Sequence, residues 1–175
     1  MTETTEHIVE SYVRYYLRWF TNSNIKAKGN KEIDILAIDH LGNRFWIECG
    51  VTHTKHWSLK AKSTDKDFQG IERKDGIKKF WRHKNSVDYF IKHKFEDLRL
   101  KERLEDFGFN DDNYTKIICC WQVKDKDAKE YAKKNGIEIW ELKEKMRDFM
   151  QDIGESHYGD DILRTLQLVK KLGDK

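Results

Sequence analysis

The sequence has no proline, only three cysteines and no long apolar run. The absence of proline favours continuous helices, because nothing removes their backbone donors. The cysteines stand at positions 49, 119 and 120, a spacing that excludes a disulfide framework and a zinc site and fits a reducing compartment. No apolar run approaches the ~18 residues that cross a bilayer, and no signal peptide is visible. We therefore expect a cytoplasmic protein without a membrane partner.

The composition is that of a folded chain. Charged residues make up 37% and hydrophobic residues 38% of 175 residues, which excludes the composition of a disordered segment. This length suffices for one domain with a core and is short for two. No repeat and no linker is visible. We expect a single domain over residues 1–175.

Residues 31–52 form the most informative stretch. Two runs rich in β-branched and aromatic residues, Glu32 to Asp39 and Arg44 to Thr52, flank the polar sequence Asp-His-Leu-Gly-Asn. This pattern predicts a β-hairpin. Asp34 and Glu48 are single acids among apolar neighbours within these runs. Because both faces of both strands are apolar, the hairpin is expected at the centre of a sheet covered on both sides.

Two acids on paired central strands need a partner, since removing water from a carboxylate costs several kcal/mol. A single acid of this kind usually pairs with lysine or arginine, or reaches water at the end of the strand. For Asp34 and Glu48 together, that explanation and a shared divalent cation are about equally supported, because one low-dielectric site must hold both charges. Oxygen ligands suit such a cation.

Residues 3–21 carry the spacing of an amphipathic helix. Its apolar face comprises Ile8, Val9, Tyr12, Val13, Tyr16, Trp19 and Phe20. Glu10 falls at the edge of this face, so a helix packed on the hairpin could direct it at the two strand acids. Glu6 lies at a similar angle and competes with it. The helix alone favours the interpretation of Glu10 as a solvated boundary residue.

These segments resemble the PD-(D/E)XK, or restriction-endonuclease-like, nuclease superfamily. The family pattern is a helix with Glu, a strand with Asp and a strand with Glu-x-Lys. Glu10 matches the helix, Glu32-Ile33-Asp34-Ile35 the first strand and Ile47-Glu48-Cys49-Gly50 the second. Gly50 stands where the family has its lysine. The resemblance covers about residues 6–50 and 114–150.

The resemblance implies metal-assisted hydrolysis of phosphodiester bonds. Asp34 and Glu48 would hold Mg²⁺ or Mn²⁺, with Glu10 as the third acid. The missing lysine would come from elsewhere in the chain: Lys55, Lys60 and Lys74 are candidates, as is Gln69, and we take Lys55 into the expected catalytic set. His53 and His56 are alternative bases or ligands, although histidines in a polar run more often serve no chemistry.

The segment from His53 to Arg103 is basic. It contains 15 Lys or Arg and 8 Asp or Glu, a formal +7, whereas the rest of the chain, with 19 basic and 23 acidic residues, sums to −4. Aromatic residues are interleaved with the basic ones, which favours contact with nucleic acid over a merely solvated lysine-rich surface. Apolar periodicity around Ile77, Phe80 and Trp81, and again around Val87, Phe90 and Ile91, predicts at least two helices. The expected nucleic-acid-binding residues are Lys60, Lys62, Arg73, Lys74, Lys78, Lys79 and Arg82.

The second half of the chain alternates strands and helices. We expect a strand at 114–123, a helix at 125–135, a strand at 137–140, a helix at 141–153 and a last helix at about 160–172. In the first half, a short strand is also expected at 24–29, before the hairpin. The expected fold class is α/β: a restriction-endonuclease-like core (3–52 and 112–153) with a central mixed sheet of four to five strands flanked by helices, a basic helical insertion (56–110) and a C-terminal helix (159–172). The apolar stripe of that last helix favours packing on the domain, with a homodimer contact as the alternative.

Two functions follow from this pattern. The first is a Mg²⁺-dependent nuclease that acts on DNA. The second is a catalytically inactive module that keeps the fold and binds nucleic acid or a protein, which would explain the lost lysine but not the retained acids. A structural α/β subunit that dimerises through its last helix would leave the segregation of charge unexplained.

Overall fold

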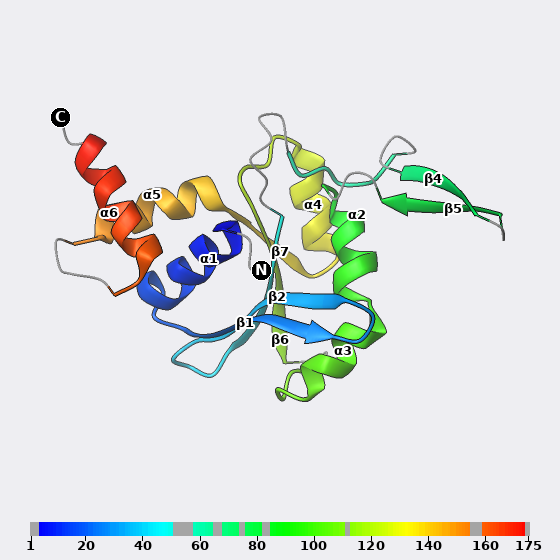
Figure 1. The fold of residues 1–175 in the computed structure, drawn as a ribbon, viewed down its shortest axis with the longest axis horizontal. Coiled ribbons are helices and arrows are strands. Elements are labelled where there is room, and N and C mark those ends of the chain that lie inside the picture. The colour runs from blue at the N-terminus through cyan, green and yellow to red at the C-terminus, as the bar shows by residue number, and fades with distance from the viewer. Residues whose placement is uncertain are drawn as a thin grey trace.

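The fold is a mixed β-sheet with helices on both faces (Figure 1). The computed structural model describes residues 4–50, 58–64, 68–73, 76–81, 85–110, 113–154 and 159–173. The predicted α/β class with a mixed sheet, flanking helices and a C-terminal helix is confirmed. None of the described helices is long and apolar enough to cross a membrane.

The central sheet has five strands in the order β1-β2-β3-β6-β7. Their bounds are Phe20–Ala27 (β1), Lys31–Ile38 (β2), Arg44–Cys49 (β3), Tyr114–Cys120 (β6) and Ile137–Glu141 (β7). The strands β1, β2 and β3 pair antiparallel, and β3, β6 and β7 pair parallel. The expected hairpin is therefore β2–β3, at the centre of the sheet. The strand expected at 24–29 begins earlier, at Phe20.

Each face of the sheet carries its own hydrophobic cluster. One face presents Leu36, Trp46 and Ile118 to the side that α2, α3 and α4 cover. The other presents Ile35, Ala37 and Ile47 to α1, α5 and α6. Because side chains alternate along a strand, this split gives each residue of β2 and β3 a defined face.

The N-terminal helix is shorter than expected. The α-helix α1 covers Thr4–Ser11 and continues as a single π-helical stretch, η1, over Tyr12–Tyr16. Arg18 then adopts a left-handed backbone with φ 59°. The helix predicted to reach residue 21 is thus wrong in its last part, and Phe20, assigned to its apolar face, is an 82% exposed strand residue. Apolar spacing alone does not show where a chain reverses.

The segment between β3 and β6 contains a hairpin as well as helices. Strands β4 (Phe68–Arg73) and β5 (Gly76–Trp81) pair antiparallel with each other and project from the body (Figure 1). The helix predicted around Ile77, Phe80 and Trp81 is therefore wrong. Two six-residue runs joined by Lys74-Asp75 already have hairpin spacing, and Gly70 and Gly76 disfavour a helix.

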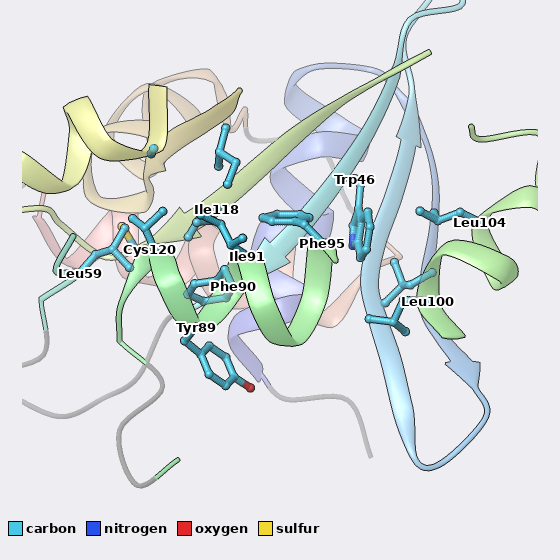
Figure 2. Close-up of a cluster of buried hydrophobic side chains, with 14 of the residues drawn as sticks. Trp46, Leu59, Tyr89, Phe90, Ile91, Phe95, Leu100, Leu104, Ile118 and Cys120 are labelled. Atoms are coloured by element: carbon cyan, nitrogen blue, oxygen red, sulfur yellow. The ribbon is translucent and has the colours of Figure 1, made fainter. Parts of the chain in front are cut away.

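The second predicted helix of this segment is confirmed. Helix α2 (Val87–Phe90) continues into a π-helical stretch, η3 (Ile91–Phe95), and α3 (Leu98–Glu105) follows. Ser86 caps α2 by accepting a hydrogen bond from the backbone amide of Tyr89. Figure 2 shows Phe90, Ile91 and Phe95 of this helix directed at the sheet, with the ring of Phe95 beside that of Trp46.

The second half of the fold follows the prediction closely. Helix α4 (Lys126–Lys134) connects the parallel strands β6 and β7, and helices α5 (Leu142–Asp152) and α6 (Asp161–Gly173) come after them. Asp125 caps α4, and Gly136 follows its end with φ 67°. The first half of α6 packs on the domain through Leu163 and Leu166, as predicted. Its second half exposes Leu168, Val169 and Leu172.

Candidate functional site

Asp34 and Glu48 meet on adjacent strands, as the sequence predicts. Ile35 pairs with Ile47, so the next register position sets Asp34 against Glu48. Asp34 is two residues from Leu36, and Glu48 is two residues from Trp46. Since alternate side chains of a strand share a face, both acids lie on the sheet face that α2 and α3 cover. Asp34 is 7% exposed and Glu48 is fully buried. The amide of Cys49 donates to Oδ2 of Asp34 at 2.8 Å, which fixes that carboxylate at the end of β3.

Lys94 joins the two carboxylates. Its Nζ lies 2.9 Å from Oδ1 of Asp34 and also contacts Oε2 of Glu48 as an ion pair. It donates in addition to the carbonyl oxygen of Glu32 at 2.9 Å. The site therefore consists of two acids and one lysine, which we call the Asp34–Glu48–Lys94 site. Gly50 does not supply the lysine here; Lys94, 44 positions farther along the chain, does.

The π-helical stretch η3 holds Lys94 in this place. The side chain of Lys31, at the start of β2, donates to the carbonyl oxygen of His93 at 3.1 Å. One residue after Lys94, the ring of Phe95 packs edge-on against Trp46 with centroids 4.9 Å apart. An extra residue in a helical turn changes which side chains face the sheet, and such turns are frequent at functional sites. Here lysine and phenylalanine, neighbours in sequence, both reach the strands.

Burial governs the charge of Glu48. Burial, together with the negative charge of Asp34, raises the pKa of Glu48 to about 8, although Lys94 and a hydrogen bond from Trp46 act in the opposite direction. That bond runs from Nε1 of Trp46 to Oε1 of Glu48 at 2.6 Å. Burial disfavours the charged form of Lys94, but the carboxylates of Glu48 and Asp34 outweigh it and raise the pKa of Lys94 well above its usual value. Lys94 is accordingly a permanent cation.

Glu10 lies elsewhere. Its carboxylate accepts hydrogen bonds from Thr21 Oγ1 and Ser23 Oγ, both at 2.9 Å, and pairs with Arg14 at 3.0 Å. Thr21 and Ser23 stand opposite residues of β2 that belong to the cluster under α1, the face away from Asp34. The expected convergence of Glu10 on the strand acids is not found. A helical angle shows which side of a helix a residue occupies, but not which face of the sheet the helix covers.

Glu6 is the helix acid with an electrostatic link to the end of β3. Burial raises the pKa of the Cys49 thiol well above its usual value, and the charges of Asp34, Glu48 and Glu6 raise it further. Cys49 directly follows Glu48 in the chain. Of the two acids weighed in the sequence, Glu6 is therefore the one whose charge reaches this strand end.

The expected nucleic-acid-binding residues fall on several elements. Lys60 is paired through its backbone with Ser86, and Lys62 lies over the ring of Tyr131. Arg73, Lys78 and Lys79 are positions of the β4–β5 hairpin. The other two, Lys74 and Arg82, lie outside the described residues. So do Lys55, which was expected in the catalytic set, and the alternative bases or ligands His53 and His56.

The sequence contained one signal for Lys94. Val87, Phe90, Ile91 and Phe95 form the apolar stripe of the helix, and Lys94 stands within that stripe at helical spacing from Phe90 and Ile91. A lysine inside a buried stripe needs an acid partner. The candidates expected from the sequence, Lys55, Lys60, Gln69 and Lys74, all stand closer to Gly50 along the chain than Lys94 does.

The donor set suits a hard divalent cation in part. Two carboxylates share the Lys94 ammonium, so the position between them already favours positive charge. Carboxylate oxygens are ligands that Mg²⁺ and Mn²⁺ accept. However, the described residues include no group of three or more His, Cys, Asp or Glu side chains that could hold a metal ion. Asp34 and Glu48 fit as two ligands, and Glu10 does not join them.

No family model matches the chain, and no curated protein matches it. One solved structure, titled as the crystal structure of AF1548, a protein of unknown function, aligns with 77% of this chain at 19% sequence identity and a TM-score of 0.46. The alignment spans only 54% of that longer protein.

Proposed function

We propose that this protein is a metal-dependent nuclease that hydrolyses DNA, with its reaction centre at the Asp34–Glu48–Lys94 site. The observation that carries the proposal is the lysine between the two acids. The resemblance to PD-(D/E)XK nucleases requires two acids and a lysine, and Gly50 left the lysine missing from its usual place. Lys94 brings the same three groups together from a different element.

Stability alone does not account for these groups. A buried ion cluster usually contributes no more to stability than apolar residues of similar volume, and often less, because each ion loses its water. Trp46, Phe95 and Ile118 would surround an apolar replacement with a continuous core. The chain keeps two carboxylates and an ammonium at this position, which supports a chemical role.

Each residue of the site has a defined part in this proposal. Asp34 and Glu48 would hold Mg²⁺ or Mn²⁺, which when bound polarises a phosphoryl oxygen and lowers the pKa of the attacking water. Trp46 orients Glu48 through its indole N–H, and the Cys49 amide orients Asp34. Lys94 keeps a positive charge at the site, where it offsets negative charge that develops on the phosphate. We place the enzyme in the cytoplasm, since Cys49, Cys119 and Cys120 are free thiols.

The basic segment supplies the substrate surface in the same proposal. Residues 53–103 carry a formal +7; they follow β3, which holds Glu48, and include the helix that holds Lys94. Phosphate contacts by lysine and arginine provide most of the sequence-independent affinity for DNA. We assign this role to Lys60, Lys62, Arg73, Lys74, Lys78, Lys79 and Arg82.

Cleavage of supercoiled plasmid and of short single-stranded, duplex and branched DNA with Mg²⁺ or Mn²⁺ tests the proposal. Asp34→Asn and Glu48→Gln keep the shape of each side chain and remove its charge. We expect either substitution to lower the cleavage rate by about 10³-fold or more, since the metal loses one of its two acid ligands. The rate follows from gel analysis of timed digests.

Glu10→Gln is the matched control for these two variants. It also replaces a buried carboxylate with its amide, but on the other face of the sheet. We expect it to retain cleavage within a few fold once its folding is confirmed by circular dichroism. Cleavage that survives both Asp34→Asn and Glu48→Gln would contradict the proposed reaction centre.

One observation favours the inactive module as a second candidate. The Lys94 ammonium already neutralises part of the charge of Asp34 and Glu48, as in a purely structural ion cluster. Metal binding separates the two functions. For a nuclease, Mg²⁺ at ten times its Kd stabilises the native state by about 1.4 kcal/mol. We expect the melting temperature to rise by about 3–6 °C for the wild type and by less than 1 °C for Glu48→Gln.

The measurement is a thermal scan over increasing Mg²⁺ or Mn²⁺, with Ca²⁺ and high NaCl as ionic controls. Equal shifts in wild type and Glu48→Gln would show binding away from this site. No shift for either metal at millimolar concentration would favour the inactive module over the nuclease.

A further inference from the structure

The two edges of the central sheet differ in how they are protected. At the β1 edge the pairing with β2 skips Asn24, which has φ 57°, and α3 lies against the strand. A left-handed residue within an edge strand breaks its row of free backbone groups and disfavours the addition of another strand there. Strand β7, at the other edge, pairs with β6 without interruption from Ile137 to Glu141. Within the described residues, no strand pairs with its far side.

A groove follows the free side of β7. It has a volume of about 630 Å³ and is lined by every residue of the strand. Helix α4 contributes Lys129 and Lys133 to one wall, and helix α5 contributes Glu144 and Lys145 to the other. The strand also has no lysine or proline of its own, the residues that commonly block an open edge. The groove therefore leaves the backbone of β7 open to an added strand.

The charges along β7 are arranged so that a second copy, related by a twofold rotation, would place acidic side chains next to basic ones. On the α5 side, Glu138 stands near the start of β7, and Lys145 lies over the ring of Trp140 near its end. On the α4 side, Lys129 pairs with Glu141 at the end of the strand, and Lys133 lies one helical turn away toward its start. An antiparallel copy of the strand brings the start of one β7 beside the end of the other. Glu138 and Glu141 then each approach a base of the other copy.

We propose that β7 pairs antiparallel with β7 of a second copy of this chain, about an axis at Ile139, and so joins two five-stranded sheets into one. In this register Glu138 lies opposite the partner's Trp140, close to the partner's Lys145. Glu141 likewise approaches the partner's Lys133. Each contact occurs twice, as in any twofold interface. The pairing does not depend on the nuclease function.

A charge exchange tests the interface. Glu138→Lys and Lys145→Glu each place like charges opposite one another across the axis, and the double variant restores opposite charges. By analytical ultracentrifugation we expect the wild type at twice the chain mass of 21.1 kDa. Each single variant is expected to weaken the dimer by tenfold or more, and the double variant to recover most of the loss. Circular dichroism establishes that all four proteins are folded.

The exposed leucines of α6 provide the competing interface and the control. Leu168→Glu with Leu172→Glu changes two exposed apolar residues of that helix, and we expect it to leave the dimer intact. A wild type that stays monomeric at about 100 µM, beyond the affinities usual for specific interfaces, would overturn the proposal. So would single charge variants that dimerise like the wild type, or dissociation caused by the α6 substitutions.

Discussion

Replacing Lys94 with methionine is expected to lower the free energy of unfolding by about 3–5 kcal/mol and to abolish metal-dependent cleavage. Methionine keeps most of the aliphatic stem but removes the ammonium that Asp34 and Glu48 share. Asp34 and the ionised form of Glu48 then remain buried without their counter-ion, and the carbonyl of Glu32 loses a donor. For a chain of this size the melting temperature should fall by about 10 °C.

Lys92→Met is the matched control, because Lys92 belongs to the same π-helical stretch. Its ammonium pairs with Asp88 at 3.8 Å on the surface, where an ion pair contributes little. We expect a change within about 0.5 kcal/mol and unaltered cleavage. Urea unfolding and plasmid digestion of both variants provide the comparison. If Lys94→Met resembles Lys92→Met in stability and activity, Lys94 has no role in the site.

Metal binding should partly rescue Lys94→Met. A divalent cation between Asp34 and Glu48 replaces the lost positive charge, whereas in the wild type it competes with the ammonium for the same oxygens. The melting temperature of Lys94→Met should therefore rise more with Mg²⁺ than that of the wild type. This response distinguishes a cation site from a position where lysine only fills space.

The acid pair could be predicted because its signal is local. Asp34 and Glu48 each interrupt a strongly apolar strand, and a hairpin with a short polar connection fixes which strands are neighbours. Period-two alternation then places both acids on one face. The strands and helices from residue 114 onward were predictable for a similar reason, since Asp125 and Gly136 mark the ends of α4 in the sequence itself.

The remainder of the site depends on tertiary placement. Lys94 is 60 residues from Asp34, and no local pattern specifies that η3 lies against the start of β2. Glu10 sits at the expected angle of its helix, but that helix covers the opposite face of the sheet. The helix predicted around Phe80 failed because apolar residues at positions 77, 80 and 81 fit a strand pair as well as a helix. Periodicity in a short run does not separate the two.

The pKa of Glu48 leads to the second large effect. In the unfolded chain this carboxyl titrates near 4.5, whereas burial raises its pKa to about 8 in the folded protein. Below pH 4.5 both states hold the proton. Between pH 4.5 and 8 the unfolded chain loses it while the native protein retains it, so stability falls as the pH rises, by at most about 1.4 kcal/mol per pH unit. Above pH 8 the contribution is constant.

Glu48→Gln should remove this dependence, because an amide does not titrate and its oxygen can still accept the bond from Trp46. Lys94 stays charged throughout the range and contributes no slope. Both proteins are unfolded with urea from pH 5 to pH 8.5, and their free energies of unfolding are subtracted at each pH. The contributions of the other titrating groups, which the two proteins share, cancel in this difference. We expect the free energy of unfolding of the variant, relative to that of the wild type, to increase steadily up to about pH 8. A difference that is flat or shrinks with pH would show that Glu48 is ionised throughout, with Lys94 outweighing the cost of its burial.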